Sequence, residues 1–324
     1  MSEYVQQPMI TYLGNKRKLI RHIENVVKRL KPSSAVDAFS GSGVVSRMLL
    51  THSDTLHVND LEVYCQVLSN CFLKTPTPEE QREIQKHIET MNNLPGRSGF
   101  ISELYAPNNS NAIQEDERCF YTKENAGKID AMMEYVHTTV PENLRSYCLG
   151  PLLVKSSIHT NTSGVFKGFH KGGWGGKKGH ALERIKGSIR VECPIWYETH
   201  KNVVVERRDV LDFLKNLPDV DLIYLDPPYN QHPYGSNYFM LNLIATNKKP
   251  EQISKVSGIP VDWNKSSYNS KTKIKDTMKR TLELSTRKAR YTLVSYSNEG
   301  FITPTEWEEL LKPYTYERID IDYN

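Results

Sequence analysis

The chain has 324 residues, 38% of them hydrophobic, and a formal net charge of +4, which allows one large core or two smaller ones and is too weakly basic to indicate nucleic acid by itself. The five cysteines are an odd number without close paired spacing, so we expect neither a disulfide framework nor a metal site. We also expect no signal peptide and no membrane partner, because the first nine residues are polar and every long segment is interrupted by charge, and the reduced cytoplasm is the natural compartment.

The first predicted element is a helix over residues 17–30, preceded by a turn at Gly14 and Asn15. This turn places Lys16 at the N-terminus of the helix, where its positive charge could pair with a carboxylate. A solvated basic start of a helix is the alternative interpretation.

A strand over residues 33–38 is followed by a glycine-containing loop and a helix over 44–52. Gly41 and Gly43 allow the backbone to approach a ligand closely. The spacing is neither the dinucleotide fingerprint nor a phosphate loop, so a nucleoside without phosphates fits better.

A second strand is predicted over 55–59, with Asp60 at its tip and a helix over 61–73 behind it. An acidic side chain at this place is suited to binding ribose hydroxyls. Asp60 can equally serve as the N-cap of the helix that starts at Leu61, and the two roles are compatible.

The segment from 75 to 200 is too long and too helical to be a simple crossover between strands. Helices are predicted over 79–91, 122–137 and 142–159, with a polar loop over 106–114. We interpret the segment as an inserted, mainly helical domain.

Within that segment, residues 161–178 combine glycine, basic and aromatic side chains. Lysines can neutralise phosphates, and aromatic rings can stack on bases or wedge between them. A flexible solvated loop is the alternative. The candidate DNA contacts are Lys167, Phe169, Lys171, Trp174, Lys177 and Lys178.

A strand over 202–206 and a helix over 210–217 precede a strand over 220–225, whose apolar run is typical of a central parallel strand. Asp226-Pro227-Pro228-Tyr229 follows it directly, at the strand end where open α/β sheets place their chemistry.

The two prolines make this turn stiff. Asp226 and the Pro227 carbonyl could accept hydrogen bonds from the exocyclic amine of a planar ring, and Tyr229 could stack on that ring. The alternative is a Pro-Pro turn that only ends a strand.

Beyond the turn, Tyr234 and Tyr238 are secondary candidates for a wall of the base pocket, and aromatic core packing from Tyr238 onwards is the alternative. We expect residues 247–276 either to order on DNA or to form a plain surface loop. Residues 291–300 indicate another central strand and its functional end, and 319–324 are strand-like and stop abruptly, so we expect natural residues beyond them.

Together, the Lys16 turn, the loop from Asp37 to Gly43 and the Asp226 turn resemble the S-adenosylmethionine-dependent amino-methyltransferases of DNA. The order of the motifs is similar to the alpha arrangement of adenine-N6 enzymes related to Dam and to type II restriction-modification methylases. The resemblance covers most of residues 8–75 and 200–324.

The resemblance implies an α/β fold with a Rossmann-like class I methyltransferase sheet, mostly parallel with an antiparallel strand in its edge region. Residues 1–74 and 201–324 would form the catalytic domain, and 75–200 the inserted domain that recognises the DNA target. The implied cofactor is S-adenosyl-L-methionine and the implied partner is double-stranded DNA. A cognate restriction endonuclease would act on the same site without a stable complex.

The resemblance also assigns roles to single residues. The expected catalytic residues are Asp226, Pro227, Pro228 and Tyr229. The expected cofactor-binding residues are Tyr12, Gly14, Asn15, Lys16, Asp37, Phe39, Gly41, Gly43, Asp60, Asp209 and Asp226. Among them, Tyr12 and Lys16 would contact the methionine part, Asp60 the ribose, and Asp209 the adenine of the cofactor.

The expected reaction is methyl transfer to N6 of an adenine that is rotated out of the duplex. Cytosine-N4 methylases share the chemistry and often have serine where Asp226 stands, so the aspartate favours adenine. RNA and protein-glutamine methylases more often have asparagine there. A catalytically silent DNA-binding module is the remaining alternative, against which Lys16, Asp60 and Asp226 argue.

Overall fold

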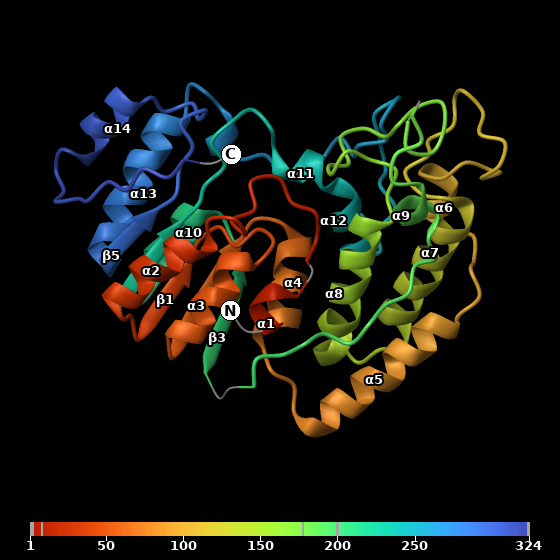
Figure 1. Cartoon of the computed structure of the whole chain (residues 1–324), viewed down its shortest axis with the longest axis horizontal. Coiled ribbons are helices and arrows are strands. Elements are labelled where there is room, and N and C mark those ends of the chain that lie inside the picture. Colours follow the sequence, from red (N-terminus) through yellow and green to blue (C-terminus); the bar gives the residue numbers. More distant parts are fainter. Residues whose placement is uncertain (1–2, 8, 177, 199–200, 323–324) are drawn as a thin grey trace.

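A parallel sheet forms the framework of the computed structural model, which describes residues 3–7, 9–176, 178–198 and 201–322 (Figure 1). The strands are β1 (Ser34–Asp37), β2 (Thr55–Asp60), β3 (Asn202–Arg207), β4 (Val220–Leu225) and β5 (Ala289–Val294). Their order is β3-β2-β1-β4-β5, and all four pairings are parallel. The order reverses between β1 and β4, which makes the carboxyl ends of these two strands the expected place for a ligand.

Side chains of neighbouring residues in β1 and β4 point to opposite faces of the sheet, and helices cover both faces. Ala35, Leu222 and Tyr224 join the core with helices α1 (Glu3–Gln6), α2 (Ile20–Leu30) and α3 (Val44–His52). Val36, Ile223 and Leu225 join the core with α10 (Val210–Asn216), α13 (Ile274–Lys288) and α14 (Pro304–Leu311). Burial on both faces explains why β4 is apolar almost throughout.

The predicted strands at 33–38, 55–59, 202–206 and 220–225 are confirmed, and the last of these is central as expected. The strand predicted within 291–300 is β5, but it lies at an edge of the sheet and is not central.

The prediction of an antiparallel strand in the sheet is wrong for the part of the chain that the structure describes. Among these residues, the one antiparallel pairing is an isolated bridge between Ile253 and Pro260. Residues 319–322 form no strand, and Ile319 is exposed, so the alternating pattern at this end finds no partner strand among the described residues.

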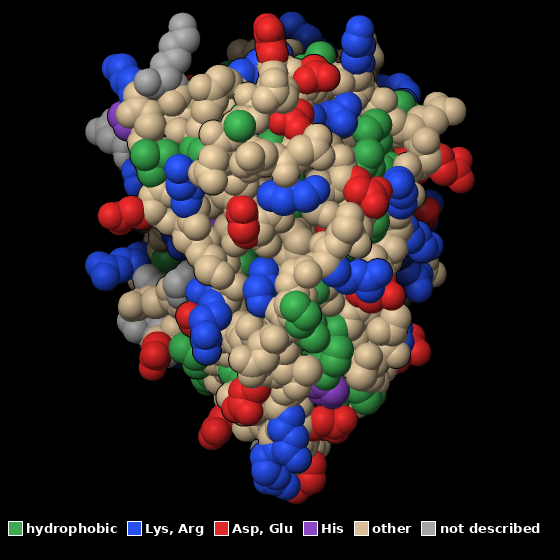
Figure 2. Space-filling view, turned by 90° about the vertical axis from the view of Figure 1, so that its right-hand side faces the viewer, with side chains coloured by type: hydrophobic (Ala, Val, Ile, Leu, Met, Phe, Trp, Pro, Cys, Tyr) green, Lys and Arg blue, Asp and Glu red, His purple; other side chains and the backbone are tan. Residues whose placement is uncertain are grey.

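A layer of helices lies beside the sheet, on the right in Figure 1. It contains α5 (Pro78–Asn93), α6 (Phe100–Leu104), α7 (Lys123–Thr138), α8 (Glu142–Ile158) and α9 (Leu182–Lys186). The three helices predicted for the middle of the chain are confirmed as α5, α7 and α8. On the face that this layer turns outward, Lys and Arg side chains alternate with Asp and Glu, and neither charge dominates (Figure 2).

This helical layer shares one hydrophobic core with two helices from outside the segment 75–200. These are α4 (Val63–Leu73) and α12 (Phe239–Thr246), which follows the short helix α11 (Tyr234–Asn237). Gly150 of α8 lies so close to α4 that an added Cβ would be 2.4 Å from Cys71 Sγ. The segment is therefore helical as expected, but its core is continuous with that of its neighbours, and its separation as a domain stays a prediction.

None of the helices within the described ranges has the length and apolar character needed to cross a membrane.

Candidate active site

A pocket opens at the carboxyl ends of the strands, where the order of the sheet reverses. The empty space within it, counted together with the open solvent at its mouth, is about 910 Å³. Asp37 ends β1, Asp60 ends β2 and Asp226 directly follows β4, and all three line the pocket. Two strand ends and one turn thus bring three acidic side chains to one cavity.

The loop after β1 is fixed by Asp60. The Gly41 N–H donates a hydrogen bond to Asp60 Oδ2 at 2.8 Å, and the Glu62 N–H donates to Oδ1 at 3.0 Å. Gly41 has a φ of +51°, and an added Cβ would lie 2.8 Å from the Tyr12 ring, so glycine is required here. The helix behind β2 begins at Val63 with Glu62 as its N-cap, so Asp60 holds the turn before the helix and does not cap it.

Asp37 is buried at the end of β1, with 1% of its surface exposed. The Ser46 hydroxyl donates to its Oδ2 at 2.6 Å, whereas Oδ1 has no hydrogen-bond partner among the described residues. Burial raises the pKa of Asp37 to about 7, and the nearby charge of Asp226 acts in the same direction. The Ser40 hydroxyl, in the same loop, also lacks a partner within the described structure. The pocket wall thus holds two polar atoms whose hydrogen-bonding capacity is unused.

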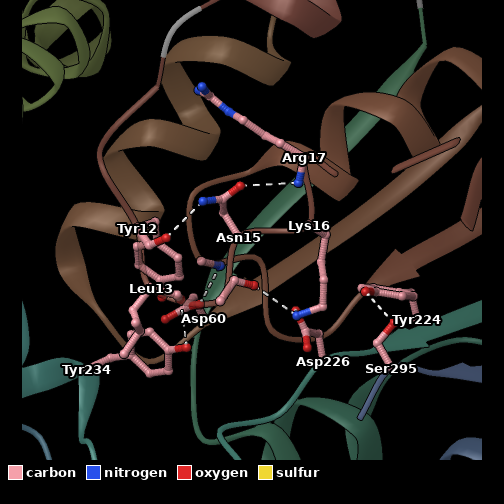
Figure 3. A network of polar contacts seen from close by, with 12 residues as sticks. Tyr12, Leu13, Asn15, Lys16, Arg17, Asp60, Tyr224, Asp226, Tyr234 and Ser295 are labelled. Atoms are coloured by element: carbon pink, nitrogen blue, oxygen red, sulfur yellow. Dashed lines mark hydrogen bonds and ion pairs between the residues drawn. The ribbon is translucent and has the colours of Figure 1, made fainter. Parts of the chain in front are cut away.

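Lys16 and Asp226 form an ion pair in the pocket, with 2.7 Å between Nζ and Oδ2 (Figure 3). Lys16 Nζ also donates to the Gly14 carbonyl at 2.9 Å. Burial raises the pKa of Asp226, and the positive charge of Lys16 opposes that rise. The sequence suggested a carboxylate partner for Lys16 in the cofactor; in the structure, Lys16 already contacts the catalytic candidate.

The turn after β4 places its residues differently with respect to the pocket. Asp226 and Pro228 line it, whereas Pro227 and Tyr229 are not part of its lining. The Tyr229 ring meets Tyr296 edge to face at 5.8 Å between centroids, and the Tyr229 carbonyl accepts a hydrogen bond from the Phe301 N–H at 2.9 Å. The turn is therefore supported by the chain that follows β5.

The other predicted cofactor residues lie around the same cavity, except one. Tyr12, Gly14, Asn15, Phe39 and Asp209 line it, while Gly43 does not. Asp209 also caps α10 by accepting a hydrogen bond from the Leu211 N–H at 2.9 Å. Gly43 starts α3 with a φ of +78°, so its role here is to let the chain enter the helix.

Within the segment 247–276, expected either to order on DNA or to form a plain surface loop, residues 264–269 contribute a wall of the pocket. Tyr268 is buried and meets the Phe39 ring edge to face at 5.2 Å between centroids. Asn264, Ser266 and Asn269 line the cavity beside it. A single aromatic residue in the polar stretch 264–276 was the signal in the sequence that could have indicated this wall.

Glu62 is a pocket residue that the sequence did not indicate. Its Oε2 accepts hydrogen bonds from Asn242 Nδ2 at 2.5 Å and from Asn264 Nδ2 at 3.0 Å. Burial raises its pKa to about 7. Through these bonds, Glu62 connects the end of β2 to α12 and to the wall formed by residues 264–269.

The predicted DNA-binding loop makes hydrogen bonds to its surroundings within its described residues. Buried Asn161 donates to the carbonyl of His170 at 3.2 Å and accepts from the Gly175 N–H at 2.9 Å. The Phe166 N–H donates to the Asn237 carbonyl of α11 at 2.7 Å, which attaches the loop to the chain that follows the Asp226 turn. Gly175 is required, because an added Cβ would lie 2.1 Å from the His180 carbonyl oxygen.

The candidate DNA contacts in this loop divide into two groups. Lys167, Lys171 and Lys178 are exposed, and Lys177 lies outside the described residues. Trp174 is buried, and its Nε1 donates to the Ser110 carbonyl at 2.9 Å. Phe169 packs edge to face on Phe120 at 5.0 Å between centroids. The structure thus presents the lysines to solvent, whereas the two rings support the loop, and their stacking on bases stays a prediction.

No group of three or more His, Cys, Asp or Glu side chains that could hold a metal ion occurs in the described part of the chain.

The parallel sheet, with a pocket lined by acidic side chains where the strand order reverses, defines an α/β protein of the class that binds ligands at the carboxyl ends of its strands. Comparison of the sequence with protein families makes this more specific. Residues 12–309 match the D12 class N6 adenine-specific DNA methyltransferases, and the chain belongs to this family.

Curated relatives are similar over nearly the whole chain. Type II methyltransferase M.CviAII of Paramecium bursaria Chlorella virus 1 is 30% identical over 94% of this chain and 88% of the relative. Type II methyltransferase M.NlaIII of Neisseria lactamica is 26% identical over 97% of this chain and 91% of the relative. Type II methyltransferase M.FokI of Planomicrobium okeanokoites is 26% identical over 96% of this chain, which corresponds to 49% of that longer protein.

Because the pKa of Glu62 is raised, we predict that the free energy of unfolding depends on pH. A carboxyl group with a pKa near 7 in the folded state and an ordinary value of 4.5 binds more protons when folded than when unfolded between these values. The free energy of unfolding should therefore fall as the pH rises from about 5 to about 8, and Glu62→Gln should make this fall smaller. Urea unfolding of both proteins across this range measures the slopes.

The exposed Glu251 provides the matched control, since Glu251→Gln should leave the wild-type slope unchanged. Equal slopes for Glu62→Gln and the wild type would contradict the assignment.

Proposed function

We propose that the protein transfers a methyl group from S-adenosyl-L-methionine to N6 of an adenine extruded from double-stranded DNA, as a site-specific adenine DNA methyltransferase. The observation that carries this proposal is the position of Asp226. It follows β4 directly, contacts Lys16 at 2.7 Å and borders a pocket that also contains Asp37 and Asp60. Membership in the D12 class family supports the choice of adenine over cytosine and of DNA over RNA or protein.

The polar and aromatic groups that line the pocket support S-adenosyl-L-methionine as the cofactor. Asp37 Oδ1 and the Ser40 hydroxyl have no partners among the described residues, and they suit the polar and cationic groups of that cofactor. Phe39 and Tyr268 offer aromatic edges and faces to a purine ring. We propose that Asp60 holds the ribose and that Asp209 lies at the cofactor's adenine. When bound, this cofactor supplies an electrophilic methyl group.

The protein's part in the reaction is to orient and polarise the target amine. The Asp226 carboxylate and the Pro227 carbonyl accept hydrogen bonds from the two N–H groups, which localises the nitrogen lone pair. Burial raises the pKa of Asp226, and the charge of Lys16 opposes this rise and so favours the carboxylate, which is the form in which both oxygens accept hydrogen bonds. Tyr229, held by Tyr296, provides a ring for the extruded base to stack on, a contact of about 1–3 kcal/mol in single-strand binders.

The exposed lysines Lys167, Lys171 and Lys178 are proposed to contact DNA phosphates, and the family's substrate supports this. The residues 75–200 are proposed as the DNA target-recognition domain, and residues 1–74 with 201–324 as the catalytic domain. Because cellular DNA is the proposed substrate, the proposed place of action is the cytoplasm of a bacterial cell.

A role in restriction-modification is supported by the names of the relatives, which are type II methyltransferases and modification methylases. We propose that a cognate restriction endonuclease acts on the same DNA site without a stable complex with this protein.

The function is tested by transfer of labelled methyl from S-adenosyl-L-methionine to unmethylated bacterial DNA, followed by nucleoside analysis of the digest. N6-methyladenine is expected. N4-methylcytosine would support methyl transfer but refute adenine as the target base. Binding of the cofactor without transfer to DNA would refute DNA as the substrate.

Asp226→Ala should lower the rate of methyl transfer by roughly 10²–10³ or more, because the amine loses a preorganised acceptor at the reacting nitrogen. DNA binding, measured by gel shift, should change little. Asp219→Asn, an exposed aspartate just before β4, is the control and should keep wild-type turnover. Turnover near the wild-type rate in Asp226→Ala would remove Asp226 from the mechanism.

Replacement of Lys167, Lys171 and Lys178 by glutamine should weaken DNA binding and reduce its dependence on salt. The slope of log K against log salt concentration should decrease by about 0.9 for each phosphate that the loop no longer neutralises. A variant with glutamine at the exposed lysines Lys31, Lys279 and Lys312 removes the same charge elsewhere and should retain the slope. Equal slopes in both triple variants would show that the loop does not contact DNA.

A further inference from the structure

Two tyrosines of one short segment hold both polar groups of a single residue, Leu13. The Tyr234 hydroxyl donates a hydrogen bond to the Leu13 carbonyl at 3.1 Å, and the Leu13 N–H donates to the Tyr238 hydroxyl at 2.7 Å. Tyr234 begins α11 and Tyr238 follows its last residue, so both rings come from the chain just beyond the Asp226 turn. Figure 3 shows Tyr234 beside Leu13 and Tyr12.

The same two rings stack on the residue before Leu13. The Tyr12 ring lies 5.0 Å from the Tyr234 ring and 4.9 Å from the Tyr238 ring, with interplanar angles of 12° and 21°. Tyr12 in turn lies against Gly41 of the loop after β1. The position of Tyr12 in the pocket is therefore set by α11 on one side and by the glycine loop on the other.

Holding Leu13 also limits where Lys16 can lie. The Asn15 N–H and side-chain amide both donate to the Tyr12 carbonyl, at 3.4 Å and 3.0 Å, so residues 12–15 form one closed turn. Lys16 leaves this turn directly and reaches Asp226. A shift of the turn would move the ammonium group away from the carboxylate.

Neither hydroxyl titrates near neutral pH. Burial raises the pKa of Tyr234 and of Tyr238 above the ordinary value of 10. Ionisation of the two hydroxyls therefore does not break these hydrogen bonds near neutral pH.

At its far end, α11 contacts the loop proposed to bind DNA. The Asn237 carbonyl accepts the hydrogen bond of the Phe166 N–H at 2.7 Å, and Lys167 follows immediately. A continuous set of contacts thus runs from this loop through α11 and Leu13 to Lys16 and Asp226.

We propose that Tyr234 and Tyr238 are positioning residues that hold the turn 12–16 for cofactor binding, and that through α11 they couple cofactor binding to binding of DNA by the glycine-rich loop. This inference rests on the proposed function, since it takes the ligands of the two regions to be S-adenosyl-L-methionine and DNA. The sequence-based expectation that these tyrosines form a wall of the base pocket stays a prediction: Tyr234 lines the pocket, whereas Tyr238 is buried in the core.

Tyr234→Phe and Tyr238→Phe test the positioning role, because each removes one hydroxyl and keeps the stacked ring. Loss of one such hydrogen bond should raise the Kd for S-adenosyl-L-methionine, measured by calorimetry without DNA, roughly 3- to 10-fold. With saturating cofactor, kcat should stay within about twofold of the wild type while KM for the cofactor rises, since the reacting groups are intact.

Tyr121→Phe is the matched control. Its hydroxyl also donates to a backbone carbonyl, that of Ser156 at 3.1 Å, but outside the pocket. Unchanged cofactor affinity in Tyr234→Phe and Tyr238→Phe, or an equal loss in Tyr121→Phe, would overturn the positioning role. Failure of the wild type to bind the cofactor would instead refute the proposed function.

The coupling is measured as the factor by which DNA changes the Kd for the cofactor. The DNA is a duplex that contains the site on which the protein acts. Thermodynamic reciprocity makes this factor the same in both directions. It should differ from 1 in the wild type and move towards 1 in the variant with phenylalanine at both positions. A wild-type factor of 1, or an unchanged factor in the double variant, would overturn the coupling.

Discussion

The ion pair between Lys16 and Asp226 is the interaction on which the arrangement of this site depends. Two charges placed in a largely buried pocket are costly unless they are paired, and removal of either one leaves the other uncompensated. The parallel register of β1 and β4 determines where Asp226 emerges, and the turn before α2 determines where Lys16 emerges. The sheet and the N-terminal turn must therefore both be in place for the two charges to meet.

Much of the fold and the centre of the site could be predicted from local patterns. The apolar run of β4, the glycines after β1 and the stiff turn at Asp226 are each readable in a few consecutive residues. Parallel pairing then places their ends at one edge of the sheet. Local signals of this kind do not require knowledge of which distant segments meet.

The features that the sequence did not reveal all depend on contacts between distant segments. Glu62 is important through Asn242 and Asn264, which follow it by about 180 and 202 residues. Trp174 lies in a loop whose composition is typical of DNA contacts, yet its indole is buried and contacts the segment that contains Ser110. The edge position of β5 and the lack of an antiparallel partner among the described residues also depend on pairing, which a strand-like pattern alone does not determine.

The contact of Gly150 with Cys71 has a consequence for how such enzymes can diversify. Because α8 packs directly on α4, without room for even one methyl group at Gly150, the helical layer and the half of the protein that contains the sheet must fit each other in shape. Exchange of residues 75–200 between relatives as an independent cassette would bring mismatched surfaces together at this seam.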